Sequence, residues 1–112
     1  MQTPNELLPD GLQMDLLWTN ASPTSSFGQQ TLNLDFTKYD FVLVQFKASA
    51  TVSGLFHAFI QKGTFIVNSS FDSLVYRYLT LSDTSIAFGN AISQGTGATN
   101  HLCIPYKVFG VK

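Results

Sequence analysis

The stretch Leu17–Phe36, "LWTNASPTSSFGQQTLNLDF", contains the features that decide the fold. An apolar run ends at Trp18, a polar run follows, and strict alternation then places apolar residues at every second position of Leu32–Phe36. Alternation with a period of two is typical of a half-buried β-strand. Because no side chain of the polar run titrates near neutral pH, we interpret Asn20–Ser26 as a corner between two strands.

The same period recurs on both sides of this stretch. Leu12–Trp18 is apolar at every second position, which predicts a strand that ends at the corner. Phe41–Lys47, "FVLVQFK", is apolar on both faces, so it should lie centrally in a sheet or face a second chain. Its residues expected in the core are Val42, Val44 and Phe46.

The second half of the chain continues in short strands. Ser53–Asn68 reads as two strands joined at a Lys-Gly pair, a signal typical of a hairpin. Leu74–Ser82 alternates Val, Leu and Leu with Tyr, Tyr and Thr. Ala91–Asn100 is rich in Gly, Ser and Thr and predicts a long flexible loop. The closing stretch His101–Lys112 predicts a strand whose Pro105 favours an edge position or a bulge.

Seven to eight short strands without any helical period predict an all-β fold. We expect an antiparallel β-sandwich, jelly-roll-like, in a single domain, because 112 residues suffice for one core. We expect residues 12–112 to form this domain and residues 1–11 to form an N-terminal arm. In this arrangement Trp18 caps one sheet, and Phe27 plugs the corner before the next strand.

The composition restricts the classes of partner. Charged residues make up 12%, about half of the roughly 25% usual in soluble domains, and the net charge is −1. Scattered basic residues argue against nucleic acid, and the lack of an apolar run of about 18 residues argues against membrane insertion. No signal peptide is visible, and one cysteine excludes an internal disulfide framework. Low charge beside 45% hydrophobic residues predicts that other chains cover part of the surface.

Candidate catalytic and metal-binding residues are few. His101 and Cys103 form an H-x-C pair, but zinc requires three or four ligands, and neither they nor His57 belong to a spacing that completes a set. We therefore expect no metal or other cofactor, and Cys103 as a buried small hydrophobe.

Hydrolytic signatures are also lacking. No GxSxG occurs, and Glu6 is the only glutamate, so a glycosidase pair of carboxylates is not expected. The run "QGTGATN" at Gln94–Asn100 lacks the Lys and the helix of a phosphate-binding loop. Two N-x-S sequons, at Asn20 and Asn68, matter only in a secreted protein. We predict that the protein is not an enzyme.

Aromatic residues on the predicted strands allow two interpretations. Tyr76, Tyr78, Tyr106 and Phe109 could form a platform for a sugar ring, since aromatic side chains supply flat apolar area with a polar tip. Cross-strand packing is the stronger interpretation, because aromatics on strands routinely stabilise sheets. The candidate ligand-facing residues are Tyr76, Tyr78, Gln94, Thr96 and Asn100.

Two long stretches resemble structural proteins of tailed bacteriophages. They are "LLWTNASPTSSFGQQTLNLDFTKYDFVLVQF" and "RYLTLSDTSIAFGNA … HLCIPYKVFGVK". In that family a Leu-Trp-x-Asn-x-x-Pro-Thr-Ser-x-Phe corner precedes QT-x-x-L-D, and the closing strand reads Ile-Pro-x-Lys-x-(Tyr or Phe)-Gly-(Ile or Val)-Lys. The likeness covers nearly all of the chain from about Leu16 onward and is looser over Ala48–Asp72.

The resemblance implies a non-enzymatic virion protein on the particle exterior, made in the host cytoplasm. Such modules look like the globular heads of tail, baseplate or head fibres, where homotrimers of β-sandwiches are usual. Because the sequence begins at Met1 without a fibre shaft, we expect a capsid decoration, a head-fibre subunit or a tail-tip module. The Met1–Gln13 arm would then anchor it to other virion proteins. The candidate trimer interface is Phe41, Leu43, Val44, Phe109 and Val111.

Two roles stay open within this reading: adhesion to a host cell-surface glycan or protein, and a purely structural role. The alternatives are a carbohydrate-binding head domain of a receptor-binding tail fibre, a cellular lectin and a carbohydrate-active enzyme. A lectin would need a polar cluster beside an aromatic residue, and an enzyme would need a pair of carboxylates.

Overall fold

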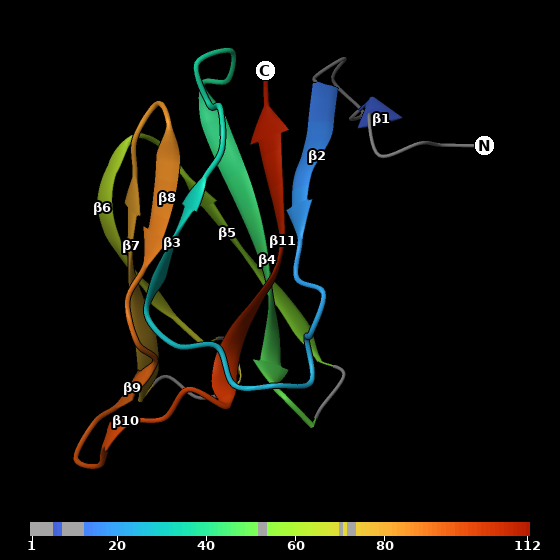
Figure 1. Ribbon diagram of the computed structural model, residues 1–112. Coiled ribbons are helices and arrows are strands. Elements are labelled where there is room, and N and C mark those ends of the chain that lie inside the picture. Colours follow the sequence, from blue (N-terminus) through green and yellow to red (C-terminus); the bar gives the residue numbers. More distant parts are fainter. Residues whose placement is uncertain (1–5, 8–12, 52–53, 70, 72–73) are drawn as a thin grey trace.

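The computed structural model describes residues 6–7, 13–51, 54–69, 71 and 74–112. Over these residues the chain forms two antiparallel β-sheets packed face to face (Figure 1). The prediction of an all-β sandwich is confirmed. Within the described ranges, no helix has the length and apolar character needed to cross a bilayer.

The first sheet, sheet A, contains the beginning and the end of the fold. Its last strand, drawn in red in Figure 1, pairs on one side with the blue strand β2 and on the other with the green strand β4. The C-terminal strand is therefore the middle strand of sheet A. In spatial order its strands are β1 (Glu6–Leu7), β2 (Gln13–Thr19), β11 (Leu102–Val111), β4 (Phe41–Ser49) and β5 (Leu55–Ile60).

The second sheet, sheet B, is organised around β7 (Val75–Leu81). This strand pairs with β6 (Gly63–Asn68) along one edge, and with β8 (Ser85–Phe88) and then β9 (Ile92–Ser93) along the other. Strand β3 (Gln30–Asn33) pairs with β8, and β10 (Gly97–Ala98) pairs with β9.

The chain winds between the sheets in a jelly-roll-like way. Among the described strands, the connections β2–β3, β3–β4, β5–β6 and β10–β11 pass from one sheet to the other. Strand β1 pairs with the start of β2, so part of the predicted arm adds a short strand to sheet A. The rest of that arm, residues 1–5 and 8–11, lies outside the described residues.

One local prediction needs correction, and another is confirmed. The turn at Lys62–Gly63 does not close a hairpin, because β5 pairs with β4 in sheet A whereas β6 pairs with β7 in sheet B. A Lys-Gly pair signals a reversal but not which sheet receives the next strand. Pro105 was expected at an edge or at a bulge, and the second alternative holds, since β11 is an internal strand. It lies at the predicted bulge, where the register between β11 and β4 shifts between Pro105 and Lys107.

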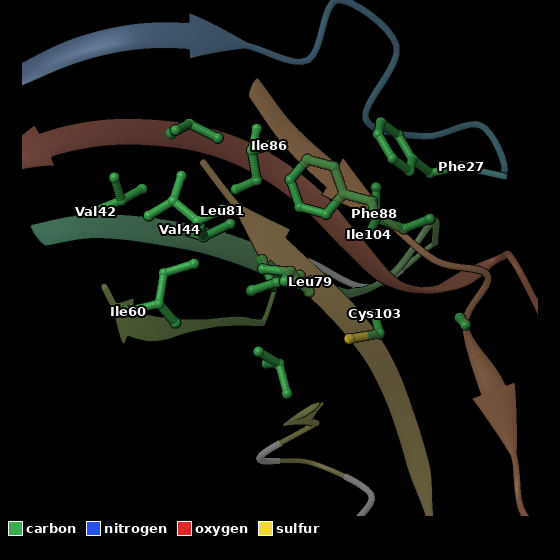
Figure 2. Packing of buried hydrophobic residues seen from close by; sticks show 14 of the residues in the cluster. Phe27, Val42, Val44, Ile60, Leu79, Leu81, Ile86, Phe88, Cys103 and Ile104 are labelled. Atoms are coloured by element: carbon green, nitrogen blue, oxygen red, sulfur yellow. The ribbon is translucent and has the colours of Figure 1, made fainter. Parts of the chain in front are cut away.

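Inward-facing residues of both sheets fill the core (Figure 2). The alternation in β4 is confirmed, because Val42, Val44 and Phe46 are all buried. Phe27 lies at the corner between β2 and β3 and is 5% exposed. Its ring meets Phe88 at 85° with centroids 5.4 Å apart, and it meets Trp18 at 72° and 6.1 Å. Edge-to-face contacts of this kind stabilise a core beyond their buried area, so Phe27 plugs the corner as predicted.

Asn20 fastens this corner to the bulge of β11. Its Nδ2 donates to the carbonyl oxygen of Pro105 at 2.9 Å, and its backbone N–H donates to that of Tyr106 at 2.8 Å. Its Oδ1 accepts from the backbone N–H of Ser22 at 2.8 Å. Asn20 is therefore buried with its hydrogen bonds formed, which explains its place in the corner motif.

Arg77 is buried in the sandwich, although its strand otherwise presents apolar residues to the core. It is 0% exposed, and its guanidinium donates to the carbonyl oxygens of Cys103 at 2.7 Å, Gly89 at 2.6 Å and Phe27 at 2.6 Å. Burial lowers the pKa of Arg77 to about 10, so the group stays cationic at neutral pH. A single side chain thus binds the corner, the β8–β9 connection and β11.

Cys103 lies against this guanidinium and confirms the expectation of a buried thiol. Burial raises the pKa of Cys103 to about 11. Its φ of 51° is left-handed, a conformation that costs about 1–3 kcal/mol for a residue other than glycine unless its surroundings enforce it. The hydrogen bond from Arg77 to the Cys103 carbonyl is one such constraint.

Tyr39 closes the end of the sandwich where β2 begins. Its hydroxyl donates to Asp15 Oδ2 at 2.6 Å, and this bond lowers the pKa of Asp15. A Cβ atom added to the buried Gly110 would lie 2.6 Å from Cγ, Cδ1 and Cδ2 of the Tyr39 ring. Glycine at position 110 therefore provides the space that the ring occupies.

We predict that Gly110→Ala lowers the free energy of unfolding by about 1–3 kcal/mol, because a methyl group must displace the base of the Tyr39 ring. Urea denaturation followed by tryptophan fluorescence measures the change. The matched control is Gly28→Ala, where the nearest atom to an added Cβ is 3.9 Å away, and it should change stability by less than about 0.5 kcal/mol. In a Tyr39→Ala background Gly110→Ala should cost less; an equal cost would contradict the steric explanation.

We predict that Arg77→Lys destabilises the fold by roughly 3–5 kcal/mol, because a lysine cannot reproduce the fork that satisfies several buried carbonyls. Denaturant titration gives the loss, and faster reaction of Cys103 with an aromatic disulfide reports the opened core. Lys38→Met removes an exposed cation and should leave both readouts near wild type. Equal stability of Arg77→Lys and wild type would show that the carbonyl contacts contribute nothing.

Candidate functional site

An apolar layer covers part of the outer face of sheet A. Cross-strand neighbours share a face of a sheet, so the paired positions of β2, β11, β4 and β5 form rows across it. One row runs Leu16, Phe109, Leu43 and Phe59, and the next runs Met14, Val111 and Phe41. We call these seven residues the apolar layer.

The apolar layer is most exposed at β5. Phe59 is 56% exposed and stacks on Phe41 with centroids 5.0 Å apart and an interplanar angle of 22°. The following row is polar, where Nε2 of Gln45 lies 3.0 Å from Nε2 of His57. The layer is therefore bordered by hydrogen-bonding groups, as the rim of a protein interface is.

The structure places the five predicted interface residues in three different environments. Phe41, Leu43 and Phe109 lie in the apolar layer and are half-buried. Val44 is on the opposite face of β4, in the core, so its assignment to an interface is wrong. Val111 belongs to the layer but is only 1% exposed, so it offers no surface to a partner.

The outer face of sheet B carries a hollow of about 310 Å³. It is lined by Ile66, Asn68, Tyr76, Tyr78 and Gln94, and we call it the tyrosine hollow. The rings of Tyr76 and Tyr78 meet at 84° with centroids 6.0 Å apart. The hollow therefore combines two perpendicular aromatic rings with two carboxamides.

Three of the five predicted ligand-facing residues, Tyr76, Tyr78 and Gln94, come together in this hollow. The other two have local roles in Ala91–Asn100, which contains the β9–β10 hairpin where a flexible loop was expected. Thr96 donates its backbone N–H to the Ser93 carbonyl at 3.1 Å within the turn. Asn100 accepts from the backbone N–H of Ala91 at 2.8 Å and donates to Asn90 Oδ1 at 3.0 Å.

The platform of four aromatic residues, the weaker of the two interpretations of these side chains, does not form. Tyr106 and Phe109 belong to β11 in sheet A, whereas the tyrosine hollow is in sheet B. Tyr106 instead lines a smaller hollow of about 210 Å³ with Pro23, Lys47 and Leu55. Sequence reasoning missed Ile66 and Asn68, although the alternation of β6 places both on the outer face.

Three titratable side chains that the structure describes, His57, His101 and Asp35, make local contacts. His57 contacts Gln45, and His101 is exposed with Nδ1 3.4 Å from Thr99 Oγ1. Asp35 accepts from the backbone N–H and hydroxyl of Thr37, which lowers the pKa of Asp35. In the described part of the chain, no group of three His, Cys, Asp or Glu residues could hold a metal ion.

Comparisons with protein-family models, with curated proteins and with solved structures found no match to this chain. The functional assignment therefore depends on the residues themselves and on the two surfaces described above.

Proposed function

We propose that this chain is a non-enzymatic structural protein of a bacteriophage virion, and that it forms a homotrimer through the apolar layer of sheet A. The observation that carries the proposal is the apolar layer itself. Large contiguous apolar patches are uncommon on monomers, and contact with another protein is one of the functions that they mark. Phe41, Leu43, Phe59 and Phe109 are the residues that a neighbouring copy would contact.

The position of β5 in sheet A supports the same conclusion. Among the described strands β5 is the last on that side of the sheet, and an edge strand invites pairing with other chains. Phe59 projects from this strand, 56% exposed. A neighbouring copy packed over the layer would cover both the edge strand β5 and the exposed Phe59.

The motif residues shared with tailed-phage proteins support the virion assignment. Asn20 and Phe27 build the β2–β3 corner, and Gly110 makes room for Tyr39. These residues stabilise the fold, as expected of a rigid structural protein. The proposed number of copies in the assembly, three, comes from the resemblance alone.

The two ends of the sandwich differ. The start of β2 and the end of β11 lie at one end in Figure 1, and the β9–β10 hairpin projects from the other. Attachment near the first end would expose the hairpin, which suits a capsid decoration, a head-fibre subunit or a tail-tip module. Such a protein would be on the particle exterior.

We predict that the purified protein sediments as a trimer at micromolar concentration and that Phe59→Asp weakens the association at least about tenfold, because a charge would be buried in the contact. The matched control is Ile66→Asp on sheet B, where the side chain is 55% exposed and outside the apolar layer. Analytical ultracentrifugation of the three proteins measures the association. A monomeric wild type, or equal effects of the two substitutions, would contradict the proposed interface.

Imaging of the bacteriophage particle that encodes this chain tests the location directly. We expect copies related by threefold symmetry, with the outer faces of sheet A in contact and the protein on the outside. A particle that lacks the chain would refute the virion assignment even if the protein trimerises.

A further inference from the structure

We propose that the tyrosine hollow on sheet B is a binding site for neutral saccharides. A sugar ring has an apolar C–H face and several hydroxyl groups that both donate and accept hydrogen bonds. The two tyrosine rings and Ile66 offer apolar surface, while the two hydroxyls and the carboxamides of Asn68 and Gln94 offer donors and acceptors. The groups that line the hollow therefore complement the C–H face and the hydroxyl groups of a sugar.

Rigid elements position most of these groups. Ile66 is paired with Tyr78, and Asn68 with Tyr76, in the register of β6 and β7. The rings of Tyr76 and Tyr78 are nearly perpendicular to each other, and both line the hollow. Gln94 adds a third side from the turn after β9. Since strands hold four of the five side chains, little ordering entropy is lost on binding.

The charge distribution of this face favours a neutral ligand. The one cation of β7, Arg77, points into the core, and Lys62 is paired with Asp83 at 3.1 Å near the other end of β6 and β7. None of the five residues that line the hollow is charged, so an anionic group would gain no Coulomb attraction from this lining to offset its desolvation. The outward residues of β6 and β7 are all uncharged: Thr64, Ile66, Asn68, Tyr76, Tyr78 and Thr80.

The dimensions indicate a small ligand held weakly. A volume of about 310 Å³ is at the lower end of the roughly 300–1,000 Å³ of ligand sites, which suits one or two sugar units. Tyr78 is 49% exposed, so much of the ligand would stay in water. We expect a dissociation constant of about 1 mM for one site. The hollow is on the face opposite the apolar layer, so binding does not require assembly, although several copies on one particle would add avidity.

The test is a titration of ¹⁵N-labelled protein, followed by amide chemical shifts. The probes are galactose, N-acetylglucosamine and maltotriose, each added to about 50 mM, well above the expected dissociation constant. At least one should shift amides of β6, β7 and Gln94 in a saturable way. Tyr78→Ala should weaken that binding about fivefold to tenfold, because the sugar loses an aromatic contact.

Two controls make the outcome decisive. Thr80→Ala changes the same face of the same strand outside the hollow and should bind like wild type. Galacturonate, the anionic counterpart of galactose, should bind no more tightly than galactose. The inference is overturned if none of the three probes shifts these amides, if Tyr78→Ala binds like wild type, or if galacturonate binds more tightly. None of these outcomes bears on trimer formation, which sedimentation measures separately.

Discussion

The hydrogen bonds of the buried Arg77 guanidinium are the constraint on which the rest of the fold depends. They bring together three places where the regular ladders are interrupted. Phe27 ends the β2–β3 corner, Gly89 follows β8, and Cys103 has a left-handed backbone inside β11. Carbonyl groups at such interruptions lack a ladder partner, and a buried carbonyl without a partner is costly. One planar group with five donors satisfies three of them at once.

This arrangement also explains how the cationic Arg77 can be buried without a carboxylate as its partner. Three short hydrogen bonds to carbonyl oxygens, with the Phe27 ring 5.3 Å from the guanidinium carbon, surround the charge with negative ends of dipoles and an aromatic face. These contacts offset the desolvation of the guanidinium. The irregular β11, the corner and sheet B are thereby held in one relative position, which fixes both outer faces of the sandwich.

Much of the fold could be predicted from the sequence, because a period of two is a local property of each strand. The alternation predicted Val42, Val44 and Phe46 in the core, and the polar run predicted the corner plugged by Phe27. The partner of each strand is not local, so the turn at Lys62–Gly63 was misinterpreted as a hairpin. Arg77 was overlooked because a charged residue is not expected in a core. Its position nevertheless continues the inward-facing series of Val75 and Leu79.

The candidate surfaces were harder to predict, for a related reason. A strand that is apolar on both faces, such as β4, does not reveal which face is outward, so Val44 was assigned to an interface although it is in the core. Ile66 and Asn68 join Tyr76 and Tyr78 only through the register of β6 and β7, which no local pattern encodes.

The two outer faces have different chemistry, and this difference argues for a division of function. Sheet A presents partly exposed apolar side chains beside a polar row, whereas the strands β6 and β7 of sheet B present tyrosine, amide and hydroxyl groups around a hollow. Apolar contact favours extended burial against a protein, while hydrogen-bonding groups that remain hydrated favour a small polar ligand. Because the two sheets pack face to face around the core, their outer faces point in opposite directions, and a chain that buries the first outer face against its copies leaves the second open. One sandwich can therefore assemble on one side and bind on the other.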